Sequence, residues 1–355
     1  MKIVTVIGAR PQFIKASMIS RVLQGCAEEI IVHTGQHYDD QMSAIFFKQL
    51  ELPTPKYHLG IGSDTHGKQT GRMIEAIESV LYIEQPQLLL VYGDTNSTLA
   101  ASLAASKLGI PIAHVESGLR SFNKKMPEEI NRVVTDHLST LLLCPTEESL
   151  KNLEREGIRH QIHLVGDVMY DSVLQYKQIA AQQSDILAKL NLSPAGYYLS
   201  TIHRAESTDN PALLCHLLET LGQLDHKVVL PMHPRTEKLI RQWQLEEHLS
   251  ASNLIIVKPL SYLDMLHLEH NAKLILTDSG GVQKEAYMLE VPCITLRNET
   301  EWVETVTAGW NQVSGINKDR IFQLISELKI PSDCPQIFGD GKASEKICQI
   351  LVSFK

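Results

Sequence analysis

Short apolar runs rich in β-branched residues alternate with longer amphipathic segments along almost the whole chain. In the first half, six runs predict strands: Ile3–Ile7, Glu29–Thr34, Leu88–Tyr92, Pro111–Val115, Leu141–Cys144 and His163–Val165. Segments of helix length lie between them: Pro11–Leu23, Gly67–Glu84, Ser97–Leu108 and Pro127–Leu138. Strand–helix alternation of this kind predicts a parallel sheet with helices on both faces.

The same rhythm restarts after a long polar helix, which the pattern predicts over Ser172–Lys189. The second set of strands is predicted at Tyr197–Ile202, Lys227–Pro231, Leu254–Val257, Lys273–Thr277 and Cys293–Leu296. A chain of 355 residues is long enough for two ordinary domains. The sequence therefore predicts an α/β protein with two doubly wound, Rossmann-like domains, residues 1–170 and 171–341, and a cleft between them.

The amino-acid composition limits the kinds of molecule that the protein is expected to bind. The net charge is −8 and no basic block offsets it, which argues against nucleic acid. No apolar run is long enough to span a bilayer, and no signal peptide precedes the first strand, so we expect a cytoplasmic protein without a membrane partner. The six cysteines show neither Cys-x-x-Cys nor Cys/His metal spacing, which is typical of reduced thiols.

In an open parallel sheet, ligands bind beyond the carboxyl ends of the strands. The run Leu274–Leu276 stops at Ser279-Gly280-Gly281, and a helical pattern that carries Glu285 follows. Backbone N–H groups and the helix dipole at such a turn favour phosphate, and Glu285 can accept hydrogen bonds from sugar hydroxyls. The alternative is a tight turn whose glycines only let a helix pack on the sheet.

Two cations, Arg10 and Lys15, follow the first strand. Only one glycine, Gly8, accompanies them, whereas a dinucleotide-binding fingerprint needs several, so an NAD role has little support. We interpret Arg10 and Lys15 as contacts to phosphate or sugar. The alternative is a pair of solvated side chains at the start of a helix.

Three carboxylates at or just after strand ends, Asp94, Glu116 and Glu128, form a candidate acid/base set. Crowded carboxylates push one another's pKa values apart, which supplies an acid and a base near neutral pH. Glu128 and Arg132 are four residues apart, on one face of a predicted helix. The alternatives are a helix cap for Asp94 and a surface ion pair for Glu128, and for Glu129 we predict a surface ion pair.

In the second predicted domain, His203-Arg204 and then His233 follow successive strands. A lone histidine is usually structural, but two such strand ends beside the Ser-Gly-Gly turn predict a pocket for a nucleoside diphosphate. The His and Glu residues show no close metal-ligand spacing, so no metal is predicted. The lack of Gly-x-Ser-x-Gly speaks against an esterase.

These motifs together resemble those of one family. They are Arg10-Pro11 with Lys15, Gly93–Thr95, His114–Arg120, Pro127–Arg132, His203-Arg204, Thr277–Glu285 and Gly339–Gly341. From Met1 to the final helix, the chain is similar to the non-hydrolysing UDP-N-acetylglucosamine 2-epimerases. The resemblance implies a glycosyltransferase-B-like fold, a UDP-sugar in the interdomain cleft, no cofactor, a homodimer, and a last helix (about 342–355) that packs back on the first domain.

Two segments resemble one branch of that family, which epimerises UDP-2,3-diacetamido-2,3-dideoxy-glucuronate at C2. They are Ser121–Met126 and Arg297–Glu304. Lys124 and Lys125 either meet the substrate carboxylate or form a solvated basic loop, and Trp302 either packs on the additional acetamido group or belongs to the core. Regulated bacterial members use a His-Arg-Arg-Glu segment and a glutamine-rich loop to bind a second UDP-sugar. This chain departs from both, at Ala205 and at Gln36–Asp39.

The resemblance also implies a mechanism, elimination of UDP followed by its re-addition. Asp94, Glu116 and Glu128 would supply the base and the acid at C2, and His203 would anchor or protonate the departing diphosphate. The implied substrate-binding residues are Arg10, Lys15, Arg132, Arg204, His233, Tyr262, Ser279, Gly280, Gly281, Glu285 and Arg297. The alternatives are an epimerase for UDP-N-acetylglucosamine, a hydrolysing epimerase that releases free sugar and UDP, and a glycosyltransferase on the same fold.

Overall fold

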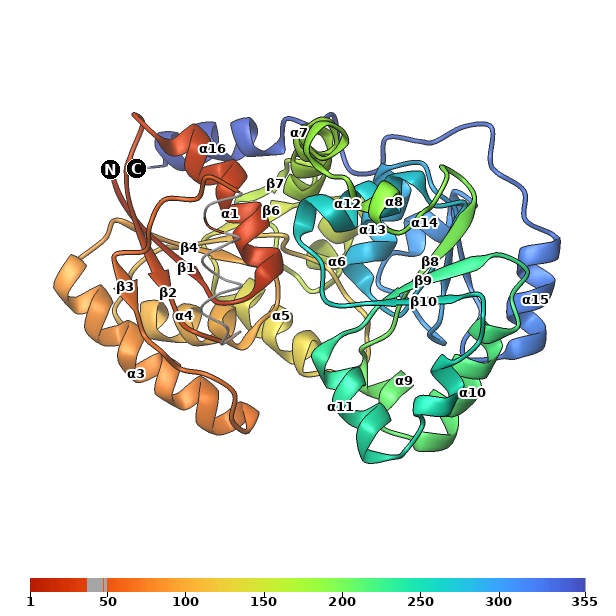
Figure 1. Cartoon of the computed structure of the whole chain (residues 1–355). Helices are drawn as coiled ribbons and strands as arrows, with labels where there is room; N and C mark the ends of the chain where they lie inside the picture. The colour runs from red at the N-terminus through yellow and green to blue at the C-terminus, as the bar shows by residue number, and fades with distance from the viewer. Residues whose placement is uncertain (37–46, 48–49, 355) are drawn as a thin grey trace. The chain divides into compact units, whose positions relative to one another are not determined.

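The computed structural model describes residues 1–36, 47 and 50–354. Of the segment Gln36–Asp39, residues 37–39 lie outside this description. The chain forms two α/β units, unit 1 (Met1–Ser172 with Phe338–Lys355) and unit 2 (Val173–Ile337), each built on one parallel sheet (Figure 1). The predicted α/β architecture with two doubly wound sheets is confirmed.

Unit 1 contains a seven-stranded sheet in the order β3-β2-β1-β4-β5-β6-β7. Its strands are β1 (Lys2–Ile7), β2 (Glu28–His33), β3 (Tyr57–His58), β4 (Leu88–Tyr92), β5 (Ile112–Val115), β6 (Leu141–Cys144) and β7 (Ile162–Leu164). Its helices are α1 (Arg10–Leu23), α3 (His66–Glu84), α4 (Asn96–Lys107), α5 (Pro127–Leu138), α6 (Glu147–Arg155) and α16 (Ala343–Ser353). Val4 and Val91 pack under α3 and α4. Helix α16 packs against α1 (Figure 1), and its residue Ile347 is fully buried.

Unit 2 contains a six-stranded sheet in the order β10-β9-β8-β11-β12-β13. Its strands are β8 (Tyr197–Thr201), β9 (Lys227–Pro231), β10 (Leu254–Val257), β11 (Leu274–Thr277), β12 (Cys293–Thr295) and β13 (Asn311–Val313). Its helices are α8 (Ile186–Lys189), α9 (Ala205–Thr208), α10 (Pro211–Gly222), α11 (Pro234–Gln242), η1 (Glu246–Leu249), α12 (Tyr262–Asn271), α13 (Gly280–Met288), α14 (Val303–Thr307) and α15 (Lys318–Ser326). Helix α7 (Val168–Gln183) leads the chain from unit 1 into unit 2.

The single long helix predicted over Ser172–Lys189 is wrong, because the chain breaks between α7 and α8. Ser184 causes this break. Its hydroxyl donates to Asp264 Oδ1 at 2.6 Å and accepts the Ile186 N–H at 3.3 Å. A serine side chain that bonds to the backbone competes with the helical hydrogen bond and favours a turn.

Both sheets have a point where the strand order reverses, between β1 and β4 in unit 1 and between β8 and β11 in unit 2. The crossovers on the two sides of such a point lead to opposite faces, which opens a crevice at the carboxyl ends of the strands. Apart from Tyr262, which follows the edge strand β10, the candidate residues of each unit follow these strands or their neighbours. Each sheet therefore presents its candidate residues at the place where this fold binds ligands.

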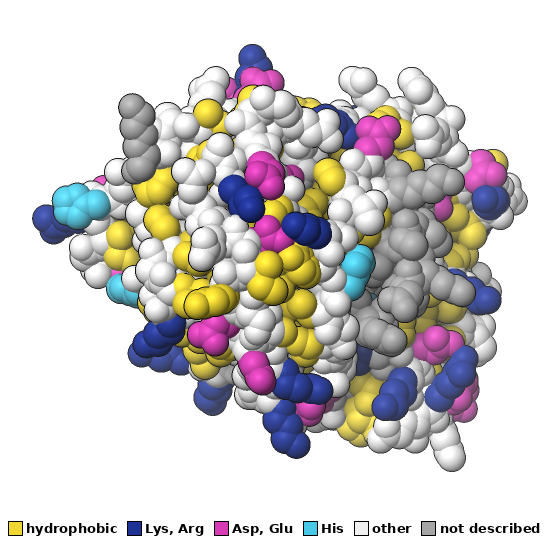
Figure 2. All heavy atoms as spheres, turned by 90° about the vertical axis from the view of Figure 1, so that its left-hand side faces the viewer, with side chains coloured by type: hydrophobic (Ala, Val, Ile, Leu, Met, Phe, Trp, Pro, Cys, Tyr) yellow, Lys and Arg dark blue, Asp and Glu magenta, His cyan; other side chains and the backbone are white. Residues whose placement is uncertain are grey.

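The described residues include no helix that is both long and apolar enough to cross a bilayer. Figure 2 shows one face of the molecule, on which basic and acidic side chains are interspersed with hydrophobic ones.

Candidate functional site

In unit 1, the side chain of Gln12 ties together the turns that follow β1 and β4. Its Oε1 accepts the N–H groups of Gly8 and Ala9 at 2.8 and 3.0 Å. Its Nε2 donates to the Tyr92 carbonyl at 2.9 Å and to Thr95 Oγ1 at 3.0 Å. Gln12 therefore fixes both strand ends at the reversal point. The sequence pattern did not indicate this role, because a single Gln on a helix is a common surface residue.

Asp94 lies two residues after the end of β4 and contacts α5. Its carboxylate is paired with Arg132 Nη2, and its backbone carbonyl accepts Asn131 Nδ2 at 2.9 Å. The Arg132 side chain is 4% exposed, whereas that of Asp94 is 34% exposed. Thr95, and not Asp94, caps α4, so the helix-cap alternative for Asp94 is wrong. The Asp94 carboxylate is therefore fixed by its ion pair with Arg132 and is still accessible to solvent.

Glu116 follows β5, which neighbours β4, and pairs with Lys15 of α1. Both side chains are at least nine-tenths buried. Glu116 has a φ of +71°, a left-handed conformation that is uncommon for a residue with a Cβ and that clusters at functional sites. Gly93 also has a positive φ, and a Cβ on it would lie 3.2 Å from Glu116 Oε2. Glycine at position 93 therefore avoids both a strained backbone and a tight contact with Glu116.

A buried network braces the turns after β4 and β5. His114 Nδ1 lies 2.7 Å from Asp136 Oδ1, and its Nε2 lies 2.7 Å from the Gly93 carbonyl oxygen. Asp136 Oδ2 accepts the Gly118 N–H at 3.1 Å and Arg120 Nη1 at 2.7 Å. His114 and Asp136 therefore act as positioning residues for the two strand ends.

Glu129 is buried, so the surface ion pair predicted for it is wrong. Its carboxylate accepts the N–H and the hydroxyl of Ser121 at 2.9 and 3.0 Å, and it pairs with Arg132 at 3.1 Å. Glu129 thereby anchors the start of the segment on which Lys124 and Lys125 are exposed. The sequence did not reveal this because a carboxylate in the first turn of a helix usually faces solvent.

Two other predicted residues of unit 1 are partly buried. Arg10 begins α1, immediately after the turn that Gln12 holds. Glu128 lies in the first turn of α5. Because Arg132 is buried, the alternative of a surface pair between Glu128 and Arg132 is wrong.

In unit 2, Asp278 organises the turn after β8. It is fully buried, and its carboxylate accepts the N–H groups of His203 and Arg204, both at 2.9 Å. The Thr201 and Thr277 hydroxyls join β8 to β11 by a 2.5 Å hydrogen bond. Asp278 was not among the predicted site residues, because its role depends on the adjacency of strands that are distant in sequence.

The Ser-Gly-Gly turn begins α13, with Ser279 capping the helix through the Val282 N–H at 3.5 Å. A Cβ on Gly280 would collide with Glu301 Oε1, whereas a Cβ on Gly281 would meet nothing closer than Ser279 Oγ at 3.8 Å. Gly280 is therefore required for packing. At Gly281 the helix N-terminus is open, which is the geometry that admits a phosphate.

His203 stacks on His233, with ring centroids 5.2 Å apart, and its Nδ1 lies 3.4 Å from Asp278. Burial lowers the pKa of His203 below its ordinary value; Asp278 opposes this shift, and Arg204 and Arg235 reinforce it. His233 is exposed and caps α11 by accepting the Arg235 N–H at 3.2 Å. The excess of cations around His203 suits an anionic ligand.

Arg297 follows β12 and is 3% exposed. Its Nη1 pairs with Glu301 at 3.0 Å, and its Nε lies 3.5 Å from Glu206 Oε2. A hollow of about 300 Å³ opens beside it and is also lined by Asn298 and Asn317. Its volume lies at the lower end of the range for small-molecule sites.

Three further residues named from the sequence are almost inaccessible. Tyr262 is 6% exposed and packs edge-on against Tyr176, with centroids 5.7 Å apart. Glu285, on α13, is 8% exposed. Trp302 is 3% exposed and lies under the Lys284 ammonium, 4.3 Å from the ring centroid, which favours the alternative that places Trp302 in the core.

Comparison with known proteins identifies the family. The model of the UDP-N-acetylglucosamine 2-epimerase family matches residues 23–352. The chain is also 54% identical to the UDP-N-acetylglucosamine 2-epimerase homolog of Methanococcus maripaludis, over 99% of both chains. The chain belongs to the UDP-N-acetylglucosamine 2-epimerase family. The prediction of a UDP-sugar 2-epimerase, an isomerase acting on carbohydrates, is thereby confirmed.

Two relatives of this epimerase bear on its substrate and its fold. The UDP-2,3-diacetamido-2,3-dideoxy-D-glucuronate 2-epimerase of Pseudomonas aeruginosa is 48% identical over 99% of both chains. The crystal structure of the Methanocaldococcus jannaschii UDP-GlcNAc 2-epimerase, in complex with UDP-GlcNAc and UDP, has a TM-score of 0.93 and 45% identity over 100% of both chains. The predicted glycosyltransferase-B-like fold is confirmed.

Proposed function

We propose that this epimerase inverts C2 of UDP-2,3-diacetamido-2,3-dideoxy-glucuronate, by eliminating UDP and adding it back to a glycal. Identities of 48% and 45% to relatives named for the two sugars do not decide between them. The observation that carries the proposal is the anchoring of the Lys124–Lys125 segment. Glu129 holds this segment and also pairs with Arg132, which in turn holds Asp94. A glucuronate carboxylate offers the two ammonium groups a partner that a glucose-type sugar lacks.

Elimination suits the carboxylates of unit 1. The C2 proton beside an acetamido group is weakly acidic, so removing it is easier when the C1–O bond breaks in the same step. A carboxylate takes the C2 proton, the C–H electrons form the C1–C2 double bond, and UDP leaves with the C1–O electrons. The reverse addition delivers a proton to the opposite face of C2. The scheme needs one group to remove the C2 proton and another to deliver a proton, and Asp94 and Glu116 are two carboxylates with separate positions in unit 1.

The residues of unit 2 can stabilise UDP as it leaves the sugar. Negative charge grows on the diphosphate as the C1–O bond breaks, and preorganised donors stabilise it. In our proposal the open N-terminus of α13 at Gly281, together with His203 and Arg204, supplies these donors. The hollow beside Arg297 takes the uridine.

Binding of a UDP-sugar is expected to raise the pKa of His203, because the diphosphate charge favours the imidazolium that burial and arginines disfavour in the free protein. The complex then binds more protons than its separate parts, so affinity increases as the pH falls from the pKa of His203 in the complex to its lower pKa in the free protein. Calorimetry of UDP-N-acetylglucosamine binding in two buffers of different ionisation enthalpy measures this proton uptake. We expect His203→Gln to abolish the uptake and His216→Gln, on α10, to retain it. If His203→Gln still took up protons on binding to the same extent as wild type, the assignment of this uptake to His203 would be wrong.

The substrate proposal is tested with purified protein and both sugars, following the manno epimer by proton NMR. We expect turnover of the diacetamido-glucuronate, and a KM at least about tenfold higher for that sugar in the double variant Lys124→Ser/Lys125→Ser, which corresponds to about 1.4 kcal/mol. The matched control is Lys68→Ser/Lys151→Ser, which removes two other exposed lysines. Turnover of UDP-N-acetylglucosamine alone would overturn the substrate proposal.

A further inference from the structure

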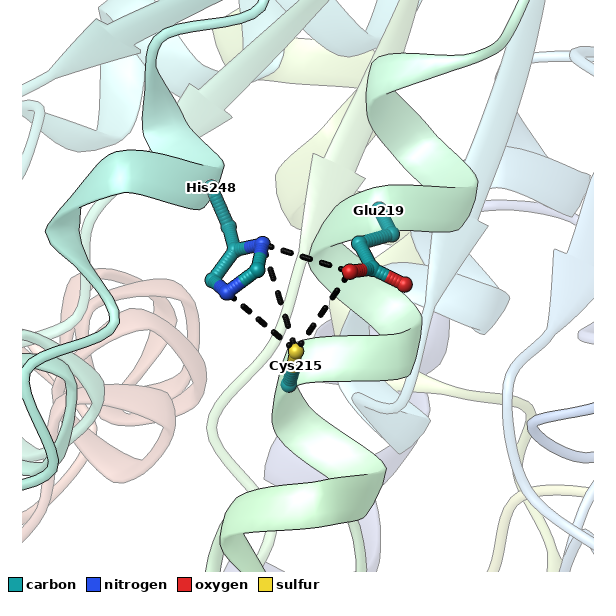
Figure 3. Close-up of side chains that lie close together, drawn as sticks. All are labelled: Cys215, Glu219 and His248. Atoms are coloured by element: carbon teal, nitrogen blue, oxygen red, sulfur yellow. Dashed lines mark hydrogen bonds and ion pairs between the residues drawn. The ribbon is translucent and has the colours of Figure 1, made fainter.

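Unit 2 carries a second group of chemically active side chains that the epimerase reaction does not use. Cys215, Glu219 and His248 point toward one another on the surface of this unit (Figure 3). Cys215 and Glu219 are at positions i and i+4 of α10, on one face of the helix. His248 belongs to η1, which lies beside α10 (Figure 3). The three side chains thus come from two elements held side by side.

The packing around η1 fixes the imidazole against the helix. Leu245 and Leu249, which flank His248 in sequence, pack against the hydrophobic core that includes Leu214 and Leu218 of α10. The His248 side chain is only 19% exposed. Its position beside Cys215 is therefore set by buried apolar contacts, and a ligand would meet a prearranged group.

The distances match the coordination sphere of a tetrahedral metal. His248 Nδ1 lies 3.9 Å from Cys215 Sγ and 3.4 Å from Glu219 Oε1, and Sγ lies 3.7 Å from the same Oε1. Bonds of about 2.3 Å to sulfur and about 2.0–2.1 Å to nitrogen and oxygen, at the tetrahedral angle, place the ligand atoms about 3.4–3.6 Å apart. Each of the three distances between ligand atoms would need to change by only a few tenths of an ångström for a metal to bind.

The other nitrogen of the same ring also has a carboxylate beside it. His248 Nε2 lies 3.6 Å from Glu247 Oε1 and 3.3 Å from Cys215 Sγ, so the ring must turn slightly for Nδ1 to face a metal beside the sulfur. Metal-bound histidines usually donate their second N–H to a carboxylate or carbonyl, which orients the ring. Glu247 can take this role when Nδ1 binds a metal.

We propose that Cys215, Glu219 and His248 bind a divalent transition-metal ion of the zinc class, with water as the fourth ligand. One thiolate, one imidazole and one carboxylate suit zinc, whereas calcium and magnesium take oxygen ligands. On binding, the Cys215 thiol releases its proton to solvent as the metal–sulfur bond forms. The ion clamps η1 to α10 across 33 residues of chain. Sequence spacing did not reveal the site, because its third ligand lies far from the other two.

The test is a titration of chelator-stripped, reduced protein with Co²⁺, followed by optical spectroscopy. We expect one equivalent to bind and to give a thiolate-to-cobalt charge-transfer band with the visible bands of tetrahedral cobalt, and we expect Zn²⁺ to displace it. Cys215→Ser is expected to lose the charge-transfer band, and His248→Gln is expected to weaken binding at least tenfold. Cys26→Ser, which removes an exposed thiol of unit 1, is the matched control and is expected to keep the band.

Three outcomes would overturn the proposal: no band, a band that survives Cys215→Ser, or a band lost in Cys26→Ser. His248→Gln keeps the thiol and changes one partly buried side chain, so it decides the matter if Cys215→Ser does not fold. None of these measurements uses turnover, and the result is independent of the proposed epimerase reaction.

Discussion

Asp94→Asn and Glu116→Gln are each expected to lower kcat by about 10²–10⁴-fold, the usual contribution of a general acid or base. An amide has nearly the shape of the carboxylate but cannot accept the C2 proton. Each amide can still accept a hydrogen bond from its cation, Arg132 or Lys15, through the remaining oxygen. Glu116→Gln also leaves the buried Lys15 without its anionic partner, so it is expected to cost stability as well as turnover. The loss should therefore appear in the chemical step and leave UDP binding within about threefold, because the proposed UDP contacts lie in unit 2.

Steady-state epimerisation and calorimetry with UDP separate the two effects. Glu147→Gln, which changes an exposed carboxylate on α6, is the matched control and should retain full turnover. If both Asp94→Asn and Glu116→Gln retained turnover, the carboxylate mechanism would be wrong. If only one of them did, the other carboxylate would be the essential base.

Asp136→Asn is expected to destabilise unit 1 by about 3–5 kcal/mol, the range for removing one partner of a buried ion pair. Asp136 is fully buried between His114 and Arg120, and an amide would leave His114 without its anionic partner and Arg120 with Glu156 alone. The surface pair Asp64–Arg72 gives the matched control. Asp64→Asn should cost less than about 1 kcal/mol.

The same carboxylate predicts a pH dependence. Burial raises the pKa of Asp136, but His114 and Arg120 outweigh it, so the pKa lies below its ordinary value. A lowered pKa contributes stability that is complete above the ordinary value of about 4 and is lost as the pH falls through the folded value. Urea unfolding should show the full difference between wild type and Asp136→Asn at pH 7 and a smaller one in acid. If Asp136→Asn lost as little stability as Asp64→Asn at neutral pH, the role given to the His114–Asp136–Arg120 network would be wrong.

Local sequence signals predicted helices and turns well where the residues that determine an element lie within that element. Helix α5 starts and ends as predicted, because Pro127 suits the first helical position and the amphipathic pattern continues to Leu138. The turn before α13 was found for the same reason, since Ser279 caps the helix and the glycines follow it directly. Strands β3 and β13 were not predicted, because each is short and has no apolar run.

The residues that hold the site together were harder to predict, because their function arises from contacts between distant segments. Gln12 joins two turns that are more than 80 residues apart in sequence. Asp278 shapes the turn of a strand 75 residues before it. Glu129 looked like an exposed residue of α5 and proved to be the anchor of a loop. No local pattern distinguishes such residues from ordinary polar side chains.

The most direct measurement of the central claim is proton NMR of the reaction in D₂O with UDP-2,3-diacetamido-2,3-dideoxy-glucuronate. Proton removal on one face of C2 and delivery on the other predicts a manno epimer that carries deuterium at C2 and is still bonded to UDP. An epimer that keeps its original hydrogen would contradict the acid/base scheme. Free sugar with released UDP would show a hydrolysing enzyme instead.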